Sequence, residues 1–100
     1  MLDKSKDVYC NVYGVKCTPK ERVTFGKELE DKIDSLGLGT HGYMIDIGGR
    51  HLIWISVFSN EQGKGKDIAP LVNELNARSL SKAKLLYNPR GEFIHDPKYL

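Results

Sequence analysis

A segment with matching helix start and stop signals constrains this fold most strongly. It reads TPKERVTFGKELEDKIDSLG, residues 18–37. Thr18, Pro19 and Glu21 suit the N-cap, N1 and N3 positions of a capping box, and Gly37 suits the position just after the helix. Apolar residues recur at intervals of four, four and three, which predicts one buried stripe: Phe25, Leu29, Ile33 and Leu36.

A second helix is predicted over about 67–80, because apolar residues again recur at helical spacing. Asp67 is a natural N-cap residue for this helix. Its predicted buried stripe consists of Ile68, Leu71, Val72 and Leu75.

Strand-type segments surround both helices. Residues 8–17 are rich in β-branched and aromatic residues, 43–58 read as a hairpin around glycines, and 83–95 read as a hairpin around Pro89 and Gly91. The order β-α-β-β-α-β predicts an α+β, ferredoxin-like sandwich. Two helices would cover one face of an antiparallel sheet, and the C-terminal hairpin would add an extra strand.

The turn of the 43–58 hairpin leaves two registers open. A two-residue turn at Gly48-Gly49 places Asp46 opposite His51 and mixes polar and apolar residues on both faces. A three-residue loop that adds Arg50 separates the faces, and we prefer it for that reason. It groups Tyr43 and Ile45 with Ile53, Ile55 and Val57.

The length of 100 residues indicates a single domain over 1–100, with frayed ends at 1–7 and 96–100. The formal net charge of +2 is too small to indicate nucleic acid by itself. No secretory signal or membrane span is recognisable. Cys10 and Cys17 on one strand would lie roughly 23 Å apart, at about 3.3 Å per residue. A disulfide cannot span that distance, so free thiols in the cytoplasm are expected.

An aromatic sheet face is the first candidate site. Tyr9, Tyr13, Trp54 and Phe58 are predicted on the face that no helix covers. Such a face can bury itself against a protein partner or a second copy, which would make the chain a dimer. It can also stack the bases of single-stranded nucleic acid. Ordinary packing under the C-terminal hairpin is the remaining alternative.

A glycine- and lysine-rich loop is the second candidate. SNEQGKGKD, 59–67, lies between a strand and a helix, where Lys64 and Lys66 would form a basic contact loop. Within it, Asn60-Glu61-Gln62-Gly63-Lys64-Gly65 resembles the pyrophosphate loop of GCN5-type acetyltransferases, which implies acyl-CoA binding. Capping by Asp67 and the missing N–H of Pro70 argue against a phosphate cradle.

No residue pattern indicates a metal, a cofactor or a catalytic group. We therefore expect a small non-enzymatic binding or regulatory protein, of the inhibitor type that phages and mobile elements encode. A minimal GCN5-like acyltransferase and a single-strand nucleic-acid-binding domain are the alternatives.

Overall fold

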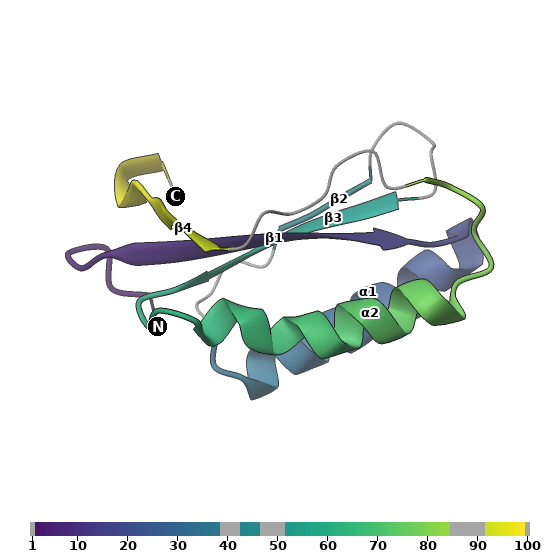
Figure 1. The fold of residues 1–100 in the computed structure, drawn as a ribbon, viewed down its shortest axis with the longest axis horizontal. Coiled ribbons are helices and arrows are strands. Elements are labelled where there is room, and N and C mark those ends of the chain that lie inside the picture. Colours follow the sequence, from purple (N-terminus) through teal and green to yellow (C-terminus); the bar gives the residue numbers. More distant parts are fainter. Residues whose placement is uncertain (1, 39–42, 47–51, 85–91, 100) are drawn as a thin grey trace.

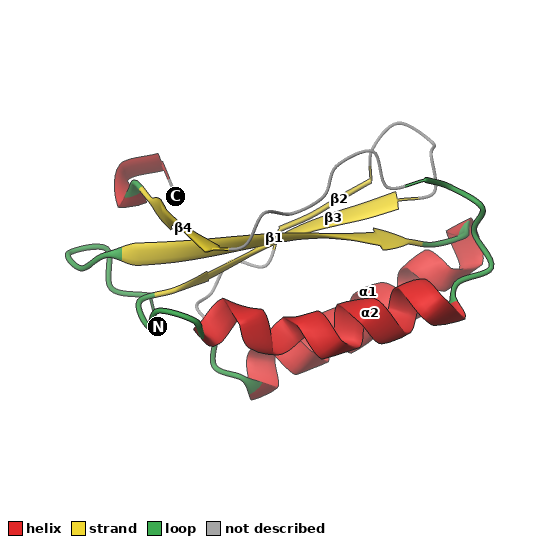
Figure 2. Cartoon of the chain, in the orientation of Figure 1, coloured by secondary structure: helices red, strands yellow, loops and turns green. Residues whose placement is uncertain are grey.

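The computed structural model describes residues 2–38, 43–46, 52–84 and 92–99. These residues form an α+β fold with two helices and an antiparallel sheet (Figure 2). In chain order the elements are β1 (Val8–Lys16), α1 (Pro19–Ser35), β2 (Tyr43–Asp46), β3 (Leu52–Ser59), the 3₁₀ helix η1 (Lys64–Ile68), α2 (Ala69–Arg78), β4 (Glu92–His95) and the 3₁₀ helix η2 (Pro97–Tyr99).

The strand order in the sheet is β2-β3-β1-β4. β1 pairs antiparallel with both β3 and β4, and β2 pairs antiparallel with β3. Both helices run along the same face of this sheet (Figure 1). β1 therefore lies inside the sheet, between β3 and β4. It runs along the long axis of the domain (Figure 1).

The signals that bound α1 act as predicted. The Thr18 hydroxyl accepts the N–H of Glu21 at 3.2 Å, and the Glu21 carboxylate accepts the N–H of Thr18 at 2.9 Å. Gly37 adopts a φ of +59°, which glycine tolerates best. The N–H of Leu38 then reaches the carbonyl of Ile33 at 3.2 Å, so the C-terminal end is also capped.

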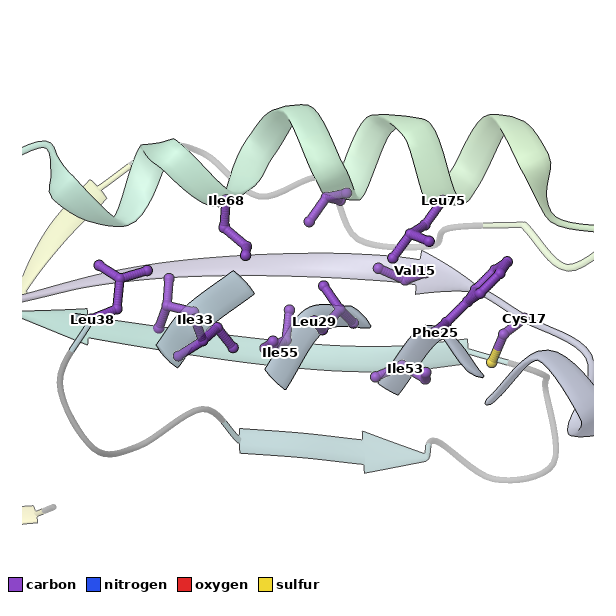
Figure 3. Close-up of a cluster of buried hydrophobic side chains, with 12 residues drawn as sticks. Val15, Cys17, Phe25, Leu29, Ile33, Leu38, Ile53, Ile55, Ile68 and Leu75 are labelled. Carbon is purple, nitrogen blue, oxygen red and sulfur yellow. The ribbon is translucent and has the colours of Figure 1, made fainter. Parts of the chain in front are cut away.

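The main core lies between the helices and the sheet. Leu29 of α1 and Leu75 of α2 are fully buried, and Figure 3 shows Ile68 and Leu75 pointing from the second helical segment toward β1. Most of both predicted stripes is confirmed in this cluster, while Leu36 and Leu71 pack at its margin. Its buried members are Val15, Cys17, Phe25, Leu29, Ile33, Leu38, Ile53, Ile55, Val57, Ile68, Val72 and Leu75.

The hairpin register differs from both predicted registers. Tyr43 lies opposite Ser56, and Ile45 lies opposite Trp54. Directly opposed residues share a face, so Ile45 belongs with Trp54 and not with Ile53. The preferred grouping of Tyr43 and Ile45 with Ile53, Ile55 and Val57 is therefore wrong, because a one-residue slip moves every side chain to the other face. The turn itself lies outside the described residues.

The second helix begins later than predicted. η1 occupies Lys64–Ile68, and α2 starts at Ala69 with Ile68 as its N-cap residue and without a side-chain cap. Asp67 lies inside η1 and does not cap α2, so that prediction is wrong. Pro70 occupies the first turn, where its missing N–H costs little.

The C-terminal region is also simpler than predicted over its described part. Residues 81–84 form no strand, and the Pro89–Gly91 turn lies outside the described residues. β4 pairs with β1 through Val8 and His95 and through Cys10 and Phe93. Among the described strands, β4 therefore lies at the edge of the sheet, beside β1. Most of the strand predicted to precede it in the hairpin lies outside the described residues.

Candidate functional site

The four aromatic residues predicted on one uncovered face lie on two different faces. Tyr13 stands opposite Ile55 in the β1–β3 pair, so it shares the helix-covered face with that core residue. Its hydroxyl donates to the carbonyl oxygen of Gly65 at 3.1 Å. Tyr9 has the same orientation by strand alternation, whereas Trp54 faces the opposite way. The prediction of a shared face is wrong because the pairing between strands, which sets it, is not visible in either strand alone.

The sheet face that neither helix covers is called here the helix-free face, and β1 and β3 contribute Val12, Gly14, Trp54 and Ser56 to its middle. At one end of this face Phe58 is only 7% exposed. The His95 ring meets it edge-on at 5.1 Å, and Leu2 packs against the same cluster. Other side chains of the chain therefore cover most of the Phe58 ring, while Trp54 is half-buried.

The glycine–lysine loop, residues 59–67, uses its backbone donors inside the chain. The N–H of Gly63 donates to the Glu92 carboxylate at 2.7 Å. The N–H of Lys64 donates to the Glu61 carbonyl at 3.3 Å, and that of Lys66 donates to the Gly63 carbonyl at 3.1 Å. A carboxylate of the chain thus lies where a phosphate would be held.

The predicted basic loop is also less basic than its sequence indicates. Lys64 forms an ion pair with Glu61 at 3.8 Å, and Asp67 is exposed beside Lys66. A surface ion pair such as that of Lys64 with Glu61 contributes little stability. Glu61 and Asp67 nevertheless reduce the positive charge that the loop presents to a partner.

Gly65 packs directly against a buried amide. A side chain at Gly65 would place its Cβ 2.2 Å from Oδ1 of Asn11 and 3.3 Å from a methyl group of Val57. Asn11 is 2% exposed, and its Oδ1 has no hydrogen-bond partner among the described residues. Burial, followed by the charges of Glu92 and Asp67, raises the pKa of nearby Tyr13, so its hydroxyl stays protonated as a donor.

Glu21 has a second role that its local motif does not reveal. Besides capping α1, its carboxylate accepts the N–H of Leu80 at 3.1 Å and the hydroxyl of Ser79 at 2.9 Å. The hydrogen bond from the Thr18 N–H lowers the pKa of Glu21 most; desolvation opposes this shift, and the Leu80 and Ser79 donors reinforce it. Glu21 therefore joins the start of α1 to the segment after α2.

Two asparagine side chains form hydrogen bonds with backbone segments that are distant from them in the sequence. Asn76 of α2 accepts the N–H of Lys16 at 2.7 Å and donates to the carbonyl of Gly14 at 2.9 Å. Asn60 likewise binds the backbone of Asp3 and Asp7, which organises the N-terminal residues expected to be frayed. These contacts span more than fifty residues, so no local signal could have indicated them.

A groove of about 540 Å³ lies between the first half of α1 and Arg78 at the end of α2. Arg78 lies over the Phe25 ring, 5.2 Å from its centroid, and pairs with Glu28 and Glu74. The groove residues are Lys20, Glu21, Thr24, Phe25, Glu28 and Arg78. Its charged groups balance one another, so the groove alone does not define a ligand.

Cys10 and Cys17 are free thiols, and both are buried. They belong to separate clusters, with Cys17 in the main core and Cys10 beside Val8 and Phe58. Burial raises the pKa of the Cys10 thiol to about 11. In the part of the chain that the structure describes, no three His, Cys, Asp or Glu side chains gather closely enough to hold a metal ion.

Comparison with known proteins gives no relative for this chain. No protein family, curated protein or solved structure matches it. None of the described helices is long and apolar enough to cross a membrane.

Proposed function

We propose that this chain is a small non-enzymatic binding protein that contacts a protein partner through the helix-free face around Trp54. The observation that carries the proposal is the incomplete burial of Val12, Trp54 and Ser56 on a sheet face that neither helix covers. Partly exposed apolar surface is found at interfaces, and tryptophan supplies much of the contact energy where it is buried further on binding.

We also propose that the domain is ferredoxin-like. The support is the strand order β2-β3-β1-β4, with β1 antiparallel to both of its neighbours, and the position of both helices on one face. This arrangement agrees with a split βαβ motif in which β4 is the sixth element. Backbone proximity of Cys10 and Phe93 in nuclear Overhauser spectra tests the pairing on which this interpretation depends.

The two alternative functions have less support. An acyl-CoA pyrophosphate would have to displace Glu92 from the N–H of Gly63. Base stacking would have to rely on Trp54, because the Tyr13 hydroxyl is engaged with Gly65 on the other face. Heat on titration with acetyl-CoA, abolished by Gly63→Trp, would favour the acyltransferase; quenching of Trp54 fluorescence by an oligonucleotide would favour nucleic-acid binding.

Site-specific photo-crosslinking tests the proposal directly. A photoreactive amino acid at Ser56, on the helix-free face, is compared with the same group at Asn73, which is exposed on α2. In cells that produce the protein, we expect one specific protein adduct from position 56 that Trp54→Arg removes. An adduct with a second copy identifies a dimer. Equal adducts from both positions, or none from position 56, would contradict the proposal.

A further inference from the structure

Basic side chains gather at one end of the domain. β1 and α2 finish at this end and α1 begins there (Figure 1). The Glu21–Leu80 and Asn76–Lys16 hydrogen bonds hold these segments together. Residues 16–22 and 78–84 contain six Lys or Arg and one acidic residue; the basic residues are Lys16, Lys20, Arg22, Arg78, Lys82 and Lys84.

The opposite end has no such excess. Residues 2–7, 60–68 and 92–98 lie together there, because β4 and the end of β3 pair with the first half of β1. These segments contain five Lys and six Asp or Glu. The nearly neutral net charge of the whole chain therefore conceals a strong difference between its two ends.

Glu21, the one acidic residue within residues 16–22 and 78–84, does little to neutralise these two segments. The Glu21 carboxylate accepts two backbone N–H groups and the Ser79 hydroxyl, so its oxygens are directed into the protein. Arg78 is paired with Glu28 and Glu74. No described residue forms an ion pair with Lys20, Lys82 or Lys84.

The segment after α2 exposes every second side chain. Ser79 Oγ accepts the N–H of Ser81 at 3.1 Å, and Ser81 Oγ accepts the N–H of Ala83 at 3.2 Å. Ser81 points inward, whereas the alternate residues Leu80, Lys82 and Lys84 are exposed. Leu80 is 80% exposed, so its apolar side chain is available for contact with a partner.

We propose that Leu80, Lys82, Lys84 and the neighbouring Lys20 form a docking surface for an acidic protein segment that also carries an apolar side chain. The lysines complement carboxylates, and Leu80 supplies an apolar contact beside them. A nucleic-acid strand fits less well, because residues 16–22 and 78–84 contain no aromatic side chain on which a base could stack. This surface is separate from the helix-free face and does not depend on the function proposed for it.

The probe is a fluorescein-labelled peptide of Glu-Glu-Leu repeats, measured by anisotropy with the full chain at about 50 mM salt. We expect Lys82→Glu/Lys84→Glu to weaken binding by about tenfold or more. The matched control, Lys64→Glu/Lys66→Glu at the other end, makes the same charge change and should alter binding by less than about twofold. Leu80→Ser should weaken binding of this peptide but not of one with Ser in place of Leu.

Three results would overturn the proposal. They are the absence of measurable binding by the wild-type chain, an equal loss in both charge-reversal variants, and tighter binding of an oligothymidylate of matched charge than of the peptide. Circular dichroism of each variant controls for folding. Trp54→Arg should bind the peptide as the wild type does, so a failure of the helix-free face and a failure of this surface are distinguishable.

Discussion

At the scale of single residues, the close approach of Gly65 to Asn11 shows how a glycine can be required by packing alone. Gly65 has no unusual φ, unlike Gly63 with a φ of +84°. Glycine is needed at position 65 because a Cβ would collide with the buried amide. At position 63 the space is open, and the backbone conformation is what favours glycine.

These two glycines give a stability prediction. Gly65→Ala should destabilise the fold by about 1–3 kcal/mol, because buried side chains must shift to admit the methyl group. Gly63→Ala, the control, should cost about 1–2 kcal/mol through backbone strain alone. Urea unfolding separates the two causes: an added Asn11→Ala should reduce the cost of Gly65→Ala but not that of Gly63→Ala. An unchanged cost in both backgrounds would argue against the collision.

Glu21 gives a pH prediction. Its pKa is lowered in the folded protein from the ordinary value of 4.5. The ionised carboxylate therefore stabilises the fold fully above about pH 4.5, and this contribution is lost as the pH falls through the lower, folded value. The difference in unfolding midpoint between wild type and Glu21→Gln should be largest near pH 7 and should shrink below pH 4.5. A constant difference would show that the carboxylate charge is not responsible.

At the scale of elements, α2 is held to the sheet by hydrogen bonds as well as by apolar packing. Asn76→Ala should destabilise the protein by about 1–3 kcal/mol, because it leaves the Lys16 N–H and the Gly14 carbonyl without their partner. Asn73→Ala on the exposed side of the same helix is the matched control, and chemical denaturation is the measurement. Equal effects would mean that only helix propensity had changed.

The β2–β3 pairing can be tested by cysteine cross-linking. In a chain whose native cysteines are replaced by serine or alanine, Tyr43→Cys/Ser56→Cys should form a disulfide under mild oxidation, because these residues are directly opposed. Tyr43→Cys/Ile55→Cys should not, since the two side chains would point to opposite faces. Gel mobility with and without reductant is the measurement. Efficient cross-linking of the second pair would contradict the observed pairing and support the register preferred from sequence.

At the scale of the whole molecule, the reactivity of the two buried thiols measures unfolding of the entire domain. Cys10 and Cys17 are buried in clusters on opposite faces of the sheet. At a pKa of about 11, about one Cys10 in ten thousand is a thiolate at pH 7. Both thiols should resist a thiol reagent in the native protein and become reactive together across the urea transition. Fast labelling of one thiol before unfolding would indicate local opening of its cluster.

Sequence signals predicted what is decided within a few residues. The capping box of Thr18 and Glu21, the turn at Gly37 and the stripe led by Phe25 and Leu29 are all local, and the structure confirms them. The strand pairing was not predictable in this way, because it is decided by packing between distant segments. The prediction that Tyr9, Tyr13, Trp54 and Phe58 share one face is wrong for this reason.

The loop and its surroundings show the same limit. Asp67 is a favourable cap by residue type, but η1 begins at Lys64 and places Asp67 within it. The bonds of Glu21 to Leu80 and of Asn76 to Gly14 connect residues about sixty positions apart. Such contacts follow from the assembled fold, so neither the basic end nor the link between α1 and the segment after α2 could be predicted from local patterns.

Asn76 has one more consequence, for the behaviour of the protein at high concentration. Among the described residues, β4 pairs with β1 from Val8 to Asn11, and the Asn76 amide binds the backbone of Gly14 and Lys16 further along β1. An uncovered strand edge can pair with a strand of another molecule and start an aggregate. Because the Asn76 amide already binds the Gly14 carbonyl and the Lys16 N–H, neither group is left for a strand of another molecule.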